Sequence, residues 1–194
     1  MGTPKVRTIG VLTSGGDAPA MNAATRAVVR VGLERGLNVK GIRKGYNGLL
    51  NEDIIDLTSR HTADSISRGG TILFTARCDE FKTPEGQKRG AEVCREQGID
   101  GLVVIGGDGS FQGAQRLAEL GINTIGIPGT IDLDIACTEY TIGFDTAATQ
   151  PWKRSIRSEI HLHPTSAAAL SRLWDGVPDI SHCGAEWQQE QRIS

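Results

Sequence analysis

The chain has 194 residues, of which 38% are hydrophobic and 23% charged, a composition typical of one globular domain with room for a further segment. Its net charge of −2 predicts no surface for nucleic acid or an anionic membrane, and its apolar runs are too short to span a bilayer. Four cysteines without a Cys-x-x-Cys pair, and no signal peptide after Met1, favour reduced thiols and a cytoplasmic protein.

The first part of the chain alternates between strand-like and helix-like patterns. A short apolar run over 7–12 predicts a buried strand, which ends at the turn cluster Ser14-Gly15-Gly16-Asp17. Apolar side chains then recur at helical spacing over 21–31, and Gly36 is placed to end that helix. A second short strand is predicted over 39–42.

The same alternation continues after a less regular stretch. A helix is predicted over 86–97, and a clearly apolar strand over 101–105 runs into the glycine cluster at 106–110. A helix over 111–120 and a strand over 122–127 follow. Strands that alternate with helices predict an α/β fold, a doubly wound parallel sheet, whose ligands bind beyond the carboxyl ends of the strands.

Glycine loops follow two of these predicted strands. Backbone N–H groups of Thr13-Ser14-Gly15-Gly16-Asp17 could cradle a phosphate at a helix N-terminus, although a plain tight turn has the same sequence features. Gly106-Gly107-Asp108-Gly109-Ser110 has the same placement and adds a carboxylate. Asp108 could hold Mg²⁺ beside the phosphate, or it could cap the following helix.

A third loop, Pro128-Gly129-Thr130-Ile131-Asp132-Leu133-Asp134, follows the last strand. Asp132 and Asp134 are two residues apart, so in extended backbone they share a face. One carboxylate could accept a hydroxyl proton while the other interacts with the cation. A polar loop containing an Asx turn is the alternative interpretation of this segment.

These segments together resemble one family. The residues from Lys5 to Ala147 are similar, in order and spacing, to the N-terminal, ATP-binding half of the ATP-dependent 6-phosphofructokinase family. The resemblance rests on IGVLTSGGDAPAMNAATRAVVR, GYNGL, RGGTILFTARCDEF, GIDGLVVIGGDGSFQGAQRL and IPGTIDLDIACTEYTIGFDTA. It implies a doubly wound ATP-binding domain and transfer of the ATP γ-phosphoryl to the 1-hydroxyl of fructose 6-phosphate in glycolysis.

The resemblance also implies roles for individual residues. ATP is expected among these positions: Gly16, Tyr46, Arg77, Cys78, Gly107, Asp108, Gly109 and Ser110. Asp108 is expected to bind Mg²⁺, and Asp132 to take the sugar hydroxyl proton. Thr130 and Asp134 are expected beside that base, and Arg77 is expected to stabilise charge on the transferring phosphoryl.

Two further expectations concern regulation and the phosphoryl donor. Arg26 and Arg30 lie one helical turn apart and match family positions that bind an allosteric nucleotide, while a solvated helix face is the alternative. The family's homotetramer is expected only with reservation for this chain. Gly109 and Gly129 favour ATP, because pyrophosphate-dependent members tend to carry Asp and Lys there.

Four positions depart from the family pattern: Ala20, Phe74, Leu133 and Cys137. Ala20, Phe74 and Cys137 replace glycines, and Leu133 replaces an asparagine between the two aspartates. Where a family glycine has a positive φ, Phe74 would be strained. These departures predict weakened activity.

The composition changes after Ala147. All three tryptophans and three of the four histidines lie in 148–194, and no sustained helical or alternating pattern is present there, which predicts an irregular tail. In a shifted reading frame its histidine groupings would be accidents and not metal ligands. We interpret 1–147 as the ATP-binding domain and 148–194 as a frame-shifted, non-homologous tail that replaces the sugar-phosphate domain. Tryptophan has a single codon, so some residues of the shifted reading frame are fixed. When the third base of each codon is read with the first two of the next, Trp152-Lys153 must encode Glu and Trp174-Asp175 must encode Gly. The family has Glu and Gly at these positions.

Three functional hypotheses are compatible with these patterns. The chain is a phosphofructokinase by descent that is itself inactive, or a nucleotide-binding module without catalysis. A lipid or NAD kinase is the third, because those families also use a Gly-Gly-Asp-Gly loop. The third hypothesis leaves the TSGGDAP and PGTID segments unexplained.

Overall fold

A computed structural model describes residues 6–149 except 133 and 137. Its elements, in chain order, are β1 (Thr8–Thr13), α1 (Met21–Glu34), β2 (Asn38–Ile42), α2 (Gly45–Leu50), β3 (Ile54–Asp56), the 3₁₀ helix η1 (Glu80–Lys82), α3 (Pro84–Glu96), β4 (Gly101–Gly106), α4 (Asp108–Glu119) and β5 (Asn123–Pro128). Residues 144–149 are also helical. The predicted tail, Leu133 and Cys137 lie outside the described residues.

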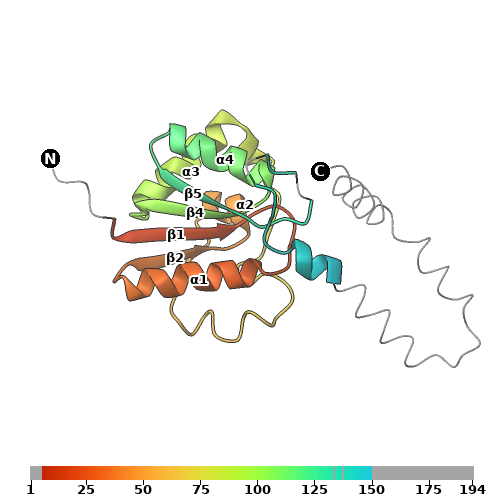
Figure 1. Ribbon diagram of the computed structural model, residues 1–194. Coiled ribbons are helices and arrows are strands. Elements are labelled where there is room, and N and C mark those ends of the chain that lie inside the picture. The colour runs from red at the N-terminus through yellow and green to blue at the C-terminus, as the bar shows by residue number, and fades with distance from the viewer. Residues whose placement is uncertain (1–5, 133, 137, 150–194) are drawn as a thin grey trace, which may run out of the picture. The chain divides into compact units, whose positions relative to one another are not determined.

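The strands form one sheet in the order β3-β2-β1-β4-β5 (Figure 1). All neighbouring pairs are parallel except β3, which pairs antiparallel with β2. The predicted α/β sheet is therefore confirmed, with one antiparallel edge strand that the sequence patterns did not reveal. An antiparallel edge on an otherwise parallel sheet is a common variant of this architecture.

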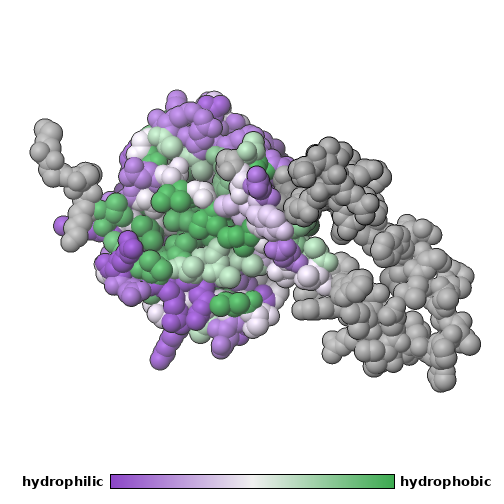
Figure 2. Space-filling view, in the orientation of Figure 1, coloured by the Kyte–Doolittle hydropathy of each residue, from purple (hydrophilic) through white to green (hydrophobic). Residues whose placement is uncertain are grey.

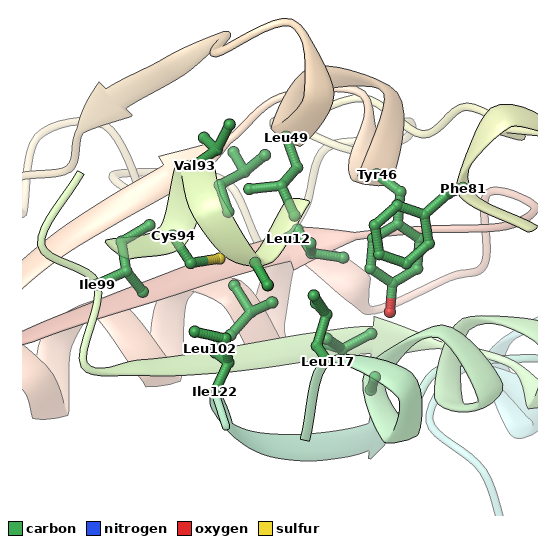
Figure 3. Packing of buried hydrophobic residues seen from close by; sticks show 14 residues of the cluster. Leu12, Tyr46, Leu49, Phe81, Val93, Cys94, Ile99, Leu102, Leu117 and Ile122 are labelled. Carbon is green, nitrogen blue, oxygen red and sulfur yellow. The ribbon is translucent and has the colours of Figure 1, made fainter. Parts of the chain in front are cut away.

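Helices cover both faces of the sheet, which explains why its strands are almost continuously apolar. In β1, Val11 belongs to the core beneath α1 and Leu12 to the core beneath α2, α3 and α4, and both side chains are fully buried. Figure 3 shows the second of these cores, in which Leu12, Leu102 and Leu117 pack together.

The strand order reverses between β1 and β4. These two strands are neighbours in the sheet, but the chain continues from β1 to β2 on one side and from β4 to β5 on the other. Such a switch point opens a crevice at the carboxyl ends of the strands. The Ser14 amide donates to the Ile105 carbonyl across this point at 3.0 Å. A Cβ on Gly106 would lie 2.5 Å from the Ser14 carbonyl oxygen, so the close approach of the two loops requires glycine there.

The α1 face of the sheet is covered unevenly within the described residues. α1 packs across β1, β2 and β4, whereas β5 packs mainly against α4 on the other face. Ile125, in the edge strand β5, is 66% exposed, and Figure 2 shows hydrophobic residues gathered across the centre of this view. No described helix is long and apolar enough to cross a membrane.

Candidate functional site

A cavity of about 860 Å³ opens where β1, β4 and β5 end. It is lined by every residue that the sequence predicted for ATP, the metal or catalysis: Gly16, Tyr46, Arg77, Cys78, Gly107, Asp108, Gly109, Ser110, Thr130, Asp132 and Asp134. These residues come from five separate stretches of the chain. The fold therefore assembles the whole predicted constellation around one space.

The loop after β1 forms one wall of this cavity. Gly15 has a φ of 91°, and a Cβ on Gly16 would meet nothing within 4 Å. The Asp17 carboxylate accepts a hydrogen bond from the Thr71 hydroxyl. α1 begins only at Met21, so the helix terminus is set back from the loop.

The loop after β4 runs directly into a helix. Gly107, in extended backbone, is the N-cap of α4, and no side chain caps the helix. Asp108 is therefore its first residue rather than a cap, and its exposed carboxylate accepts from the Gln112 amide at 2.7 Å. Because the first N–H groups of a helix lack intrahelical partners, this end of α4 suits an anion.

Tyr46 joins the cavity to the core. Its ring stacks on Phe81 with centroids 4.0 Å apart, and its hydroxyl donates to the Ser110 carbonyl at 2.6 Å (Figure 3). Burial, followed by the nearby Cys94, raises the pKa of Tyr46. The phenol is thus a neutral donor. A Cβ on Gly113 would lie 2.8 Å from this ring, so α4 can approach it only through glycine.

The loop after β5 is bent rather than extended. Thr130 is 8% exposed, and its hydroxyl oxygen accepts from the Asp132 amide at 3.2 Å. This bond defines a threonine turn, and the backbone bends at residues 131 and 132. The backbone at 131 and 132 is therefore bent and not extended, because the Thr130 hydroxyl offers the backbone a local turn. Asp132 and Asp134 nevertheless both line the cavity.

The two arginines predicted for an effector lie outside the cavity. Arg26 and Arg30 are on α1, where Arg30 is exposed. The Arg26 guanidinium donates through Nη1 to the Thr62 carbonyl at 2.7 Å. The structure thus keeps this pair apart from the predicted nucleotide and catalytic residues.

Sequence reasoning missed several residues of the cavity wall. Lys82 and Arg116 bring positive charge, and Gln112 and Gln115 bring amides. Asp108, Gln112 and Arg116 are four residues apart along α4, so they share one face of that helix. This spacing, counted from the predicted metal residue, is the signal that could have revealed them.

Two of the family departures occupy strained backbone. Ala20 and Phe74 have φ angles of 66° and 57°, in the left-handed region that favours glycine. The expected strain at Phe74 is confirmed, and its side chain is 56% exposed.

Asp108, Asp132 and Asp134 are the acidic residues expected to handle cation and proton. Across the described part of the chain, no three His, Cys, Asp or Glu side chains cluster as a ready-made metal site. This sparse set of oxygen donors suits Mg²⁺, which commonly binds one or two carboxylates and completes its coordination with substrate phosphates and water.

Comparison with known proteins gives consistent matches. The sequence model of the family described as Phosphofructokinase matches residues 8–166. The chain is 65% identical over 142 residues to an ATP-dependent 6-phosphofructokinase of Clostridium botulinum (strain Hall), covering 73% of this chain and 44% of that protein. It is 66% identical over 142 residues to the protein of that name from Clostridium tetani, with the same coverage. The chain therefore spans less than half the length of these relatives.

Solved structures of phosphofructokinases also match this chain. The phosphofructokinase of Saccharomyces cerevisiae superposes with a TM-score of 0.71 at 36% identity, over 80% of this chain and 24% of that one. The T-state phosphofructokinase of Pichia pastoris gives 0.66 at 38% identity, over 73% and 17%. A pyrophosphate-dependent phosphofructokinase from Marinobacter aquaeolei, at 23% identity and TM-score 0.63 over 79% and 42%, shows likeness of fold alone.

Proposed function

This chain belongs to the phosphofructokinase family, and from that premise we propose that its cavity is the Mg-ATP site of an ATP-dependent 6-phosphofructokinase. One observation carries the proposal: all the residues expected to surround nucleotide, metal and reacting hydroxyl line the same cavity. That cavity lies at the switch point of the sheet, where doubly wound folds bind nucleotides.

The two glycine loops and the uncapped start of α4 would hold the phosphates through backbone N–H groups. Arg77 would stabilise charge on the γ-phosphoryl, and Asp108 would hold Mg²⁺, which when bound neutralises phosphate charge. Gly109 supports ATP over pyrophosphate through the resemblance, because pyrophosphate-dependent members tend to carry Asp at this position. A Cβ there would meet nothing within 4 Å, so the structure leaves room for such a side chain.

In the family reaction, the Asp132 carboxylate would accept the proton of the 1-hydroxyl of fructose 6-phosphate. The freed oxygen then attacks the γ-phosphorus, the bond to the β-phosphate oxygen breaks, and ADP leaves. The Thr130 turn holds the Asp132 backbone in place for this step. Asp134, on the same wall, would complete the acidic side of the site.

We propose that this chain alone does not turn over. Residues 148–194 would be a frame-shifted tail in place of the sugar-phosphate domain. Such a tail would not supply the residues that hold the sugar phosphate, so the positioning that supplies about 7–11 kcal/mol of barrier lowering would be lost. Mg-ATP binding without catalysis is the second candidate function, because the residues expected around the nucleotide all line the cavity. A nucleotide effector at Arg26 and Arg30, and a tetramer, remain predictions.

Titration calorimetry with Mg-ATP tests the nucleotide site. Asp108→Ala is expected to weaken binding about tenfold or more, whereas Glu92→Ala, an exposed change on α3, leaves it unchanged. If Asp108→Ala binds Mg-ATP as tightly as the parent chain, Asp108 has no role in holding the metal.

A coupled assay for fructose 1,6-bisphosphate tests catalysis. The expected result is no turnover above a blank without protein. Turnover that is lost in Asp132→Ser would show that the chain builds a sugar site of its own, and would overturn the proposal of an inactive chain.

A further inference from the structure

The segment that delivers Arg77 and Cys78 to the cavity is not part of any helix or strand. It runs over 68–78 as turns and loops, yet both residues line the cavity wall. Something other than secondary structure must therefore fix its position. Its contacts come from α1, from β1 and the loop that follows it, and from Lys44, whose amide donates to the Leu73 carbonyl at 2.8 Å. The Leu73 side chain is also buried in the core.

Asn22, in the first turn of α1, makes three of these hydrogen bonds. Its Nδ2 donates to the Gly70 carbonyl at 2.7 Å and to the Arg68 carbonyl at 3.3 Å. Its Oδ1 accepts from the Ile72 amide at 2.8 Å. A single side chain thus satisfies three backbone groups within five residues of the segment. Asn22 is 4% exposed, so water cannot readily replace these bonds.

Other contacts extend the same attachment toward Arg77. The Thr71 hydroxyl donates to the Asp17 carboxylate, and the Thr13 hydroxyl donates to the Phe74 carbonyl at 2.9 Å. Thr13 ends β1 and Asp17 belongs to the loop that follows it. The segment is consequently tied to the glycine loop that forms the opposite part of the cavity wall.

We propose that Asn22 is a positioning residue: through Gly70 and Ile72 it fixes the 68–74 segment, and thereby sets where Arg77 and Cys78 meet the bound nucleotide. Asn22 itself does not line the cavity, so it acts through the segment rather than by touching the ligand. The inference rests on the proposed nucleotide site, and it assigns that site a residue whose side chain lies outside it.

The neighbouring Thr25 provides a matched control. It is also on α1 and fully buried, but its hydroxyl donates only to the Met21 carbonyl of its own helix. Thr25→Ala should therefore lower the stability of α1 without releasing the segment. Asn22→Ala removes all three bonds, and Asn22→Asp keeps only the acceptor for the Ile72 amide.

Two measurements on the whole chain test the proposal: the Kd for Mg-ATP, and the rate at which iodoacetamide alkylates Cys78, followed by peptide mapping because the chain has three other cysteines. Asn22→Ala is expected to weaken Mg-ATP about tenfold and to change the Cys78 rate several-fold. The Kd and the Cys78 rate of Asn22→Asp should lie between those of Asn22→Ala and the parent chain. Thr25→Ala should leave both values within about twofold of the parent chain.

The proposal is overturned if Asn22→Ala matches Thr25→Ala in both measurements. If Asn22→Ala does not fold, Asn22→Asp replaces it, since losing the donations to the Gly70 and Arg68 carbonyls should shift Cys78 reactivity in the same direction. An unchanged rate there also overturns the proposal. A parent chain that does not bind Mg-ATP would refute the proposed function, while the Cys78 rates would still decide the role of Asn22.

Discussion

Phe74 is a large side chain on a backbone that favours glycine. Its φ of 57° is left-handed, a conformation that costs roughly 1–2 kcal/mol for a residue with a Cβ. The Phe74 carbonyl is held by the Thr13 hydroxyl, so the backbone cannot easily relax. Strain is therefore stored three residues before Arg77.

Phe74→Gly is expected to raise the free energy of unfolding by about 1 kcal/mol, the relieved strain less the extra freedom of glycine in the unfolded chain. Phe74→Ala is the control, because it removes the exposed ring but keeps a Cβ. Urea denaturation of the two variants compares them directly. Equal stability of the Gly and Ala variants would mean that the left-handed backbone carries no strain.

Gly109 tests the preference for ATP at a single position. It is the second residue of α4, and a Cβ there meets nothing within 4 Å, so Gly109→Asp should fold normally. Its carboxylate would stand in the space proposed for phosphate and repel it, weakening Mg-ATP by about tenfold or more. Gly109→Ala adds a methyl group without charge and is expected to bind more tightly than the Asp variant in the same titration.

At the scale of elements, one hydrogen bond joins α2 to α4. The Tyr46 hydroxyl in α2 donates to the Ser110 carbonyl in α4, and both residues are buried. Tyr46→Phe removes this hydrogen bond from a carbonyl that also accepts within α4, so we expect a loss of about 1 kcal/mol in the free energy of unfolding. Thermal denaturation monitored by circular dichroism measures it.

The same contact predicts a dependence on pH. Because the pKa of Tyr46 is raised in the folded state, its contribution is complete below about pH 10, the unfolded value, and falls as the pH rises further. Above about pH 10 the parent chain should therefore lose stability more steeply than Tyr46→Phe. Parallel slopes for the two proteins would contradict this assignment.

Elements with a clear apolar period were predictable from sequence, and short glycine-rich ones were not. β1 and β4 carry runs of buried residues, and α1 carries buried residues at helical spacing. α2 has six residues, two of them glycine, and β3 has three, so neither offers enough positions for a period to show. α2 forms because Tyr46 and Leu49 pack into the core, and β3 because it pairs with β2, tertiary causes that a local pattern cannot reveal.

The residues of the candidate site also separate into those that the sequence predicted and those that it could not. Residues in the loops after the strands were predictable, because glycines and carboxylates mark those loops in the sequence. Phe81 and Lys82 reach the cavity from η1, which has no amphipathic pattern and was not predicted. Asn22 was beyond prediction, since its role depends on where the 68–74 segment passes over α1.

For the whole molecule, the reading frame makes a prediction independent of the structure. The encoding DNA, read one base over from about codon 148, should continue as a phosphofructokinase sequence without an early stop, as the forced Glu and Gly at the tryptophan codons suggest. Sequencing the gene decides it. A stop codon soon after that position would refute the interpretation of 148–194 as a shifted frame.

The exposed edge of the sheet predicts how the chain behaves at high concentration. β5 has no charged residue and its Ile125 is 66% exposed, and among the described residues no strand pairs with its outer side, where another copy could pair. Ile125→Lys should reduce self-association measured by sedimentation. Ser59→Lys, which adds the same charge at an exposed site outside the sheet, is the control and should have little effect.

The position of β1 in the sheet also sets an order of events during folding. β1 spans Thr8–Thr13, but its partner β4 begins only at Gly101, and the loops that follow these two strands both line the cavity. Pairings between distant segments fold slowly, because the chain entropy of closing the intervening loop must be overcome first. On a ribosome, the first glycine loop would leave the exit tunnel well before the strand that completes its site. The nucleotide cavity would therefore be among the last features of this sheet to form.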